Sequence, residues 1–244
     1  MGQYVFSRAK RNNYKISGDE YSVGLDALQA LKKEDGETLG GIFKDLMNYV
    51  FLEKGLGAPK IYSRYELAHT GDCYVPKNSG VHLFSFYNDF GPINQLVFGC
   101  GDVLSDLNGA INNALKDAME IKDHIRDERR FVDATLFDRS FFPEEAQFLK
   151  DTLIPRKGKP DNTNDAFGVF IGYKVEIPRQ TPPQLFPEAL KKRMQEDIRS
   201  CTPYIKERID NLGLSMHSFY FFFLPLNFKT ANDPESIMTE VLGA

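Results

Sequence analysis

Apolar residues at helical spacing form the clearest pattern in the chain. Between residues 39 and 51 they recur every three or four positions, which places them on one face of a helix. Gly55 follows this stretch, where a glycine typically ends a helix. By the same criterion, the predicted helices span residues 23–33, 39–55, 103–125, 141–155 and 187–211, the last either continuous or interrupted at Thr202–Pro203.

Segments rich in β-branched and aromatic residues separate these helices. The predicted strands span residues 59–67, 80–87, 94–99, 166–177 and 214–227. The second and third strands are separated by a short, turn-rich stretch, NDFGP, which predicts that they pair as an antiparallel hairpin. Residues 1–20 are polar and basic, and we expect an arm or an edge strand there.

The order of these elements predicts an α/β fold with a mixed central sheet flanked by helices. The chain has 244 residues, of which 42% are hydrophobic, so it is long enough to bury a sizeable core. We therefore predict an N-terminal arm over residues 1–22 and one α/β domain over residues 23–244.

Composition narrows the class of protein. The three cysteines are far apart and no pair has metal-ligand spacing, which favours a reduced, cytoplasmic protein. The N-terminus lacks the apolar stretch of a secretory signal, and the apolar run Phe219–Leu226 is far short of the ~20 residues that a membrane helix needs. The net charge is −4, so binding to nucleic acid would need a local basic patch or a partner protein.

The junction at Cys100-Gly101-Asp102 carries the main functional question. Nucleases often place a carboxylate and a lysine at such a strand end, whereas this chain has a cysteine, a glycine and an aspartate. Asp102 is either a relocated metal ligand or an N-cap of the following helix, a role that Ser105 could also take. Cys100 is either a reactive thiol or a small buried residue, which is the commoner case for a free cysteine.

Four segments carry a family resemblance. They are GETLGGIFKDLMNYVFLEKGLGAPKIYSRYEL, NSGVHLF, QLVFGCGDVLSDLNGAINNAL and FGVFIGYKVEI, in this order. Together they resemble the C-terminal domain of the HamA family of the Hachiman antiphage defence system, over residues 4–227. The resemblance implies a PD-(D/E)xK nuclease-like fold and a metal-dependent DNA nuclease that works beside a helicase. Such chemistry uses carboxylates to hold Mg²⁺, which activates water and stabilises charge on the phosphate.

The reactive groups that the resemblance implies are missing from this chain. Cys100 stands at the position of the family glutamate, and Asp102 stands at the position of the lysine. Ser79 and Gly80 occupy the place of the second-strand carboxylate. Glu37 remains on the first helix, but glycines follow it where a second acidic residue is usual. Because a thiolate is a poor ligand for Mg²⁺, the resemblance implies a vestigial site with no catalytic residue, no bound metal and no cofactor.

Other residues offer weaker candidates. His82 lies beside the second-strand position, and it either faces the cleft or is a hydrogen-bonded sheet residue. Glu66, Asp72 and Asp102 could supply metal ligands only if the site were relocated, although Asp72 suits a turn. A glycine-bearing loop at 156–159 could contact phosphate or simply be solvated. Its cations are Arg156, Lys157 and Lys159.

Three functions remain open at this stage. The preferred one is a catalytically inactive nuclease-fold subunit of an antiphage defence system, which binds DNA, or a helicase-like or nuclease-like protein of the same system, and regulates it. The second is an active Mg²⁺-dependent DNA endonuclease with relocated residues. The third is an interaction domain without a nucleic-acid role. None of the three involves a membrane.

Overall fold

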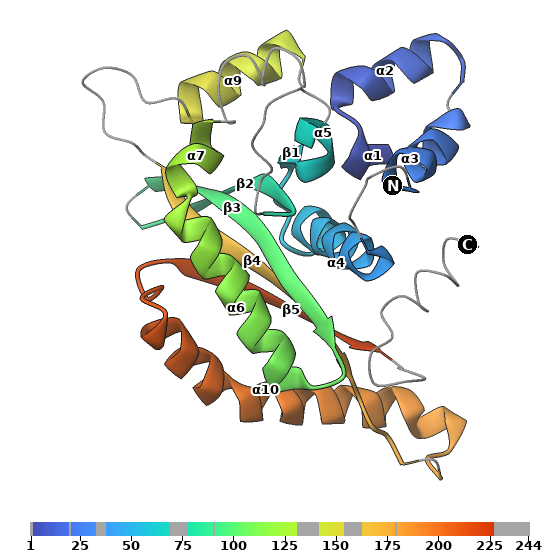
Figure 1. Ribbon diagram of the computed structural model, residues 1–244, viewed down its shortest axis with the longest axis vertical. Coiled ribbons are helices and arrows are strands. Elements are labelled where there is room, and N and C mark those ends of the chain that lie inside the picture. Colours follow the sequence, from blue (N-terminus) through green and yellow to red (C-terminus); the bar gives the residue numbers. More distant parts are fainter. Residues whose placement is uncertain are drawn as a thin grey trace.

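A five-stranded mixed sheet forms the centre of the protein (Figure 1). The computed structural model describes residues 2–19, 21–32, 38–68, 78–89, 91–130, 142–153, 163–178 and 180–226. The strands follow their order in the chain, namely β1 (Lys60–Ser63), β2 (Gly80–Asn88), β3 (Gly91–Leu104), β4 (Thr163–Lys174) and β5 (Ser218–Leu226). The predicted fold class, a mixed sheet flanked by helices, is confirmed.

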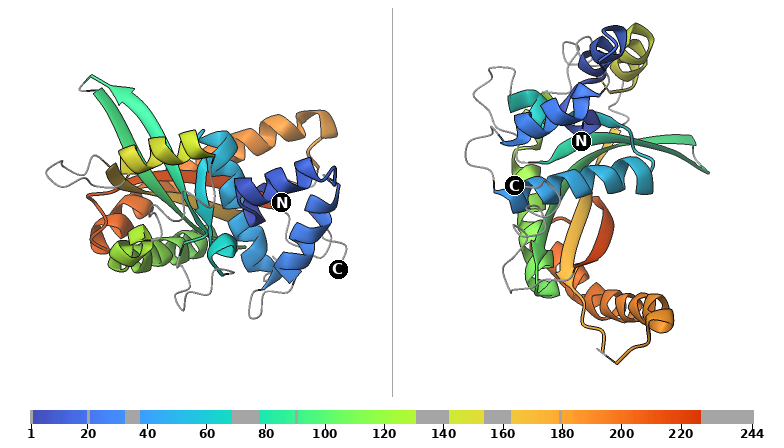
Figure 2. Two further views of the ribbon diagram at one scale, coloured as in Figure 1. Left: turned by 90° about the horizontal axis from the view of Figure 1, so that it is seen from above. Right: turned by 90° about the vertical axis from the view of Figure 1, so that its right-hand side faces the viewer.

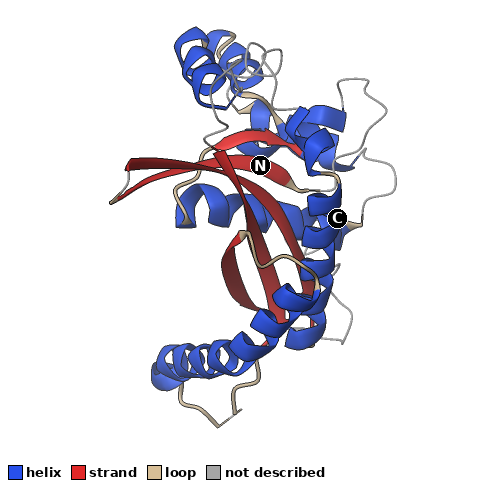
Figure 3. Cartoon of the chain, turned by 90° about the vertical axis from the view of Figure 1, so that its left-hand side faces the viewer, coloured by secondary structure: helices blue, strands red, loops and turns tan. Residues whose placement is uncertain are grey.

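The sheet changes from antiparallel to parallel at β3. β1 and β2 pair antiparallel, and β2 and β3 form the predicted hairpin, whose distal end projects beyond the helices (Figure 3). β3, β4 and β5 run parallel. The inner strand β4 is buried from Ala166 to Tyr173, as expected when helices cover both faces of a parallel sheet.

Different helices cover the two faces of the sheet, and each contacts its own set of sheet residues. The helical segments are α1 (Gly2–Val5), α2 (Arg8–Ile16), α3 (Ser22–Lys32), α4 (Leu39–Val50), the π-helical turn η1 (Phe51–Gly55), α5 (Arg64–Ala68), α6 (Leu107–Asp123), α7 (Ile125–Arg130), α9 (Pro143–Leu153), the 3₁₀ turn η2 (Pro183–Leu185) and α10 (Phe186–Asn211). α6 and α4 lie on opposite faces (Figure 2). The apolar face of α6 packs with Phe98 and Phe167, whereas α4 packs Phe43 against Phe170. No helix in the described part of the chain is long and apolar enough to cross a membrane.

The strand leading into α6 is longer than predicted. β3 continues to Leu104 because it pairs with β4 along its full C-terminal half, ending at Leu104↔Tyr173. The N-cap of α6 is Asp106, whose carboxylate accepts a hydrogen bond from the Gly109 amide at 2.6 Å. The prediction that Asp102 or Ser105 caps this helix was therefore wrong, because pairing with β4 holds Asp102 in an extended strand.

Local structure also differs from prediction near the N-terminus and in α10. Residues 2–16 form helices α1 and α2 in place of an arm or edge strand, and Tyr4, Val5 and Phe6 are buried. The β1 strand is shorter than expected, because α5 begins at Arg64. α10 runs unbroken through Pro203. The division into an arm and one domain remains a prediction.

Candidate functional site

The positions of the expected nuclease motif lie where β2 begins and along the C-terminal part of its neighbour β3. β2 begins at Gly80, and its ladder with β3 extends only to Val81↔Phe98. One further backbone bond joins the Ser79 amide to the Gly99 carbonyl, at 2.9 Å. We call the segment Ser79–Gly80 together with residues 99–104 of β3 the β3 notch. It contains Ser79, Gly80, Cys100 and Asp102. Their role in a nuclease site remains a prediction.

Asn48 of α4 closes one face of the β3 notch. Its fully buried side-chain amide donates to the carbonyls of Cys100, at 2.7 Å, and Gly168, at 3.0 Å, and approaches the Ser79 hydroxyl at 3.4 Å. A Cβ at Gly99 would lie 2.3 Å from the Ser79 Oγ, so a side chain there would displace its neighbours. This face is therefore filled by an amide that satisfies backbone carbonyls.

Cys100 points to the opposite face and is buried under α6. Its side chain is 4% exposed and belongs to the apolar cluster that α6 forms with the sheet. Burial raises the pKa of the Cys100 thiol well above its usual range, and the nearby charge of Asp117 adds to this effect. The thiol thus stays protonated, and a protonated thiol is neither a nucleophile nor a metal ligand.

Asp102 lies on the same side as Cys100 but near the surface. Its Oδ2 accepts a hydrogen bond from the side-chain amide of Asn113, on α6, at 2.9 Å. Asp117, one turn further along α6, is 3.7 Å from the Lys44 ammonium of α4. Burial raises the pKa of Asp117, the Lys44 charge opposes this, and the Asp102 charge raises it further. Two half-exposed carboxylates and one lysine therefore share the rim of the β3 notch.

The donor set of the β3 notch does not fit Mg²⁺. This ion requires several oxygen ligands in near-octahedral geometry. One face of the notch offers a protonated thiol and the Asp102 carboxylate, which Asn113 engages, and the other offers a serine hydroxyl beside an amide. The second carboxylate on the rim, Asp117, is paired with Lys44. Within the described ranges, no group of three or more His, Cys, Asp or Glu side chains is placed to hold a metal ion.

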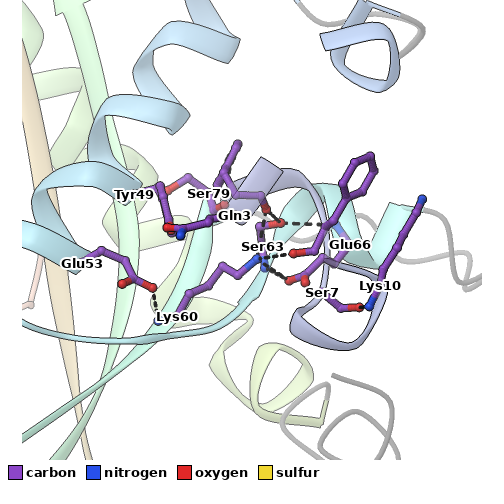
Figure 4. Close-up of polar contacts among 11 residues, drawn as sticks. Gln3, Ser7, Lys10, Tyr49, Glu53, Lys60, Ser63, Glu66 and Ser79 are labelled. Atoms are coloured by element: carbon purple, nitrogen blue, oxygen red, sulfur yellow. Dashed lines mark hydrogen bonds and ion pairs between the residues drawn. The ribbon is translucent and has the colours of Figure 1, made fainter. Parts of the chain in front are cut away.

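Glu66 is engaged in a separate buried network around β1 (Figure 4). Its Oε2 lies 3.1 Å from the Lys60 ammonium and accepts from the Ser63 amide at 2.8 Å. Lys60 also donates to the carbonyls of Tyr4, at 3.1 Å, and Phe6, at 3.3 Å. Burial lowers the pKa of Lys60, while Glu66 opposes this shift. Glu66 thus holds the N-terminal helices in place and does not join Asp102.

His82 is a buried sheet residue. Its Nδ1 lies 2.8 Å from the Ala58 carbonyl, a distance that suits donation from a neutral imidazole. Burial lowers the pKa of His82 to about 4, because the charged form would lose its hydration. The side chain therefore supplies a structural hydrogen bond near β1.

Several predicted residues lie outside the described ranges. They are Glu37, Asp72, Arg156, Lys157 and Lys159. In contrast, the structure adds polar residues of α4 that sequence reasoning missed, namely Asn48 and Asp45, whose carboxylate is 2.7 Å from the Arg64 guanidinium. The sequence contains one indication of them: Asp45 and Asn48 are polar, lie three residues apart and therefore share one side of the helix, next to its apolar face.

Comparison with known proteins gives one family match. The family model described as HamA matches residues 1–231. No curated protein and no solved structure matches the chain.

Proposed function

This chain belongs to the HamA family, whose members are components of antiphage defence, and we propose that it serves there as a catalytically silent nuclease-fold subunit. In this role it binds a helicase-like or nuclease-like protein of the same defence system and regulates it. The observation that carries the proposal is the pair of residues at the Glu-x-Lys positions. Cys100 is a buried, protonated thiol, and Asp102 is a carboxylate held by Asn113.

These two substitutions remove both parts of metal-assisted hydrolysis. Without a carboxylate at position 100, the donor set lacks an oxygen ligand that would help to lower the pKa of a bound water. Without a lysine at position 102, no cation on β3 faces the scissile phosphate, and a negative charge stands there instead. Repulsion between Asp102 and a phosphate opposes the approach that hydrolysis requires.

Contact with DNA is a further part of the proposal. The chain as a whole is acidic, but Arg156, Lys157 and Lys159 concentrate positive charge within four positions. Such clusters supply non-specific affinity for the phosphate backbone. Charge reversal at these three residues should weaken any salt-dependent binding of duplex DNA.

The catalytic part of the proposal is tested by incubating the purified protein with supercoiled plasmid DNA and Mg²⁺ or Mn²⁺. We expect no nicking by the wild type, and no calorimetric binding of Mn²⁺ at millimolar concentration. An active nuclease with relocated residues would behave differently. DNA cleavage that disappears in Asp102→Ala would overturn the silent-subunit proposal.

The regulatory part needs the partner protein. We expect co-expression with the helicase-like or nuclease-like protein of the same defence system to give a complex that elutes together. The measurement is the partner's ATP hydrolysis or DNA cleavage with and without this chain. Co-elution with a several-fold change in rate supports regulation, whereas separate elution and unchanged rates contradict it.

A further inference from the structure

We propose that a pocket at the top of the molecule binds a single nucleotide unit, a ligand that joins a flat aromatic base to an anionic phosphate. The pocket has a volume of about 380 Å³ and lies between α2, the β1–β2 edge of the sheet and α9. These three elements approach one another in Figures 1 and 2. The pocket lies apart from the β3 notch, and the inference does not depend on the proposed function.

The walls of the pocket suit an aromatic ring. Ile61 and Leu83 from the sheet and Leu149 from α9 form an apolar surface, and the Phe148 side chain stands beside them with 61% of its surface exposed. Pockets for small molecules typically begin at about 300 Å³, so the volume is sufficient for one base. An accessible phenylalanine ring offers a stacking partner for any base.

Positive charge lies on one side of the pocket. Arg8 lines it, and Arg11 and Lys15 follow on the same face of α2 at spacings of three and four residues. α2 contains four basic and no acidic residues, in a chain whose net charge is −4. The rim at α2 is therefore a local site for an anion, and a phosphate attached to the base would lie there.

Glu144, at the start of α9, allows the pocket to distinguish between bases. Its carboxylate accepts hydrogen bonds and cannot donate them when ionised. An exocyclic amino group, as on cytosine, is a donor that acidic side chains recognise in bases. Thymine offers only a carbonyl at that position, so we expect cytosine to bind better than thymine.

The N-terminal part of the pocket is held in place before any ligand binds. Lys60 contributes to the lining, but its ammonium is bonded to Glu66 and to the Tyr4 and Phe6 carbonyls (Figure 4). This network holds the backbone that precedes α2, which lowers the ordering cost of binding at that end of the pocket.

Calorimetry with dCMP, TMP and deoxycytidine tests the assignment. Binding of dCMP should weaken about tenfold in Phe148→Ala, and Phe148→Leu, which keeps apolar bulk, should lie in between. Arg8→Ala should weaken dCMP about fivefold and leave deoxycytidine unchanged. Glu144→Gln should remove the preference for dCMP over TMP.

Matched controls come from the same structure. Phe142→Ala removes a ring that is 50% exposed and does not line the pocket, and Lys174→Ala removes a cation at the far end of β4. Neither should alter binding. Absence of dCMP binding at 10 mM, or equal weakening by Phe142→Ala and Phe148→Ala in proteins with unchanged melting temperature, overturns the proposal.

The nucleotide unit could be a free nucleotide or the end of a DNA strand. A single-stranded oligonucleotide with a 5′-phosphorylated terminal cytosine distinguishes these two sources. Binding at least tenfold tighter than dCMP, with the same dependence on Phe148, identifies a strand end. Binding no tighter than dCMP identifies a free nucleotide. Both results support the pocket, whereas oligonucleotide binding that is unaffected by Phe148→Ala contradicts it.

Discussion

Two lysine–carboxylate pairs in this protein illustrate different uses of charge. Lys60 and Glu66 are 3.1 Å apart, and their side chains are only 6% and 7% exposed. Lys44 and Asp117, on the rim of the β3 notch, are 3.7 Å apart and 26% and 42% exposed. A buried charge needs a partner and further hydrogen bonds, because desolvation costs several kcal/mol per ion. A half-exposed pair keeps part of its hydration and contributes less.

The difference shows which charged groups the fold depends on. Lys60 has backbone acceptors as well as Glu66, and these acceptors belong to the segment that joins α1 to α2. At the β3 notch, Cys100 packs in the core under α6, whereas Asp102 makes a hydrogen bond to Asn113 near the surface. A change at Asp102, the lysine position of the expected motif, should therefore cost the fold little, which is consistent with a silent subunit.

The largest effect is expected from Lys60→Met. The substitution leaves Glu66 buried without its cation, and breaking such a pair typically costs about 3–5 kcal/mol. Urea denaturation should show this loss in the free energy of unfolding. Hydrogen exchange should rise first in α1 and α2, because Lys60 no longer holds their junction.

Two variants sharpen this prediction. Lys60→Met combined with Glu66→Leu should recover much of the stability, because neither charge is then buried alone. Lys44→Met, the matched change in the exposed pair, should cost less than about 1 kcal/mol. Equal losses in Lys60→Met and Lys44→Met would contradict the distinction between the two pairs.

A smaller effect follows from the pH dependence of His82. Its pKa in the folded protein is about 4, against an ordinary value of 6.5, because burial disfavours the charged ring. Between these values the unfolded chain binds a proton that the folded protein does not. Stability should therefore be complete above pH 6.5 and fall by about 3 kcal/mol as the pH drops to about 4.

Denaturation at a series of pH values measures this slope. His82→Asn keeps a donor for the Ala58 carbonyl but cannot titrate, so its curve should be flatter between pH 6.5 and 4. His124→Asn, which removes an exposed histidine after α6, is the matched control variant. If the stability of His82→Asn fell with pH as steeply as that of the wild type, another group would be responsible for the loss of stability between pH 6.5 and 4.

Much of the fold follows from periodicity, and the errors have physical causes. α3 and β2 were predicted within one residue, and the predicted helix over residues 39–55 corresponds to α4 together with the π-helical turn η1, since each presents a regular apolar pattern. The end of β3 was missed because its last residues are held by pairing with β4, a contact between distant segments. The helices at residues 2–16 were missed because their apolar residues are few and Tyr4, Val5 and Phe6 lie together.

The candidate site was only partly accessible from the sequence. Position-by-position comparison proposed Ser79, Cys100 and Asp102. The structure places the Ser79 side chain beside Gly99 and Asn48 but turns Cys100 toward the opposite face of the sheet, under α6. The comparison could not reveal that Asn48 fills the face of the sheet opposite to Cys100. Its side-chain amide donates to carbonyls of β3 and β4, which are far from Asn48 in the sequence. The pocket beside Phe148 combines three segments whose lining residues, from Arg8 to Leu149, lie up to 141 positions apart in the chain, so no local pattern marks it.

The smallest effect is expected from Asp102→Ala, at the lysine position of the motif. Asp102 is half-buried and makes one hydrogen bond, to Asn113, so stability should fall by less than about 1 kcal/mol. The informative measurement is an NMR titration of Asp117. Its pKa is raised by burial and by the Asp102 charge, so it should move down in the variant, and Lys116→Ala on the exposed face of α6 serves as the control. An unchanged Asp117 titration in Asp102→Ala would mean that Asp102 does not face α6. The placement of the Glu-x-Lys positions on that face would then be wrong.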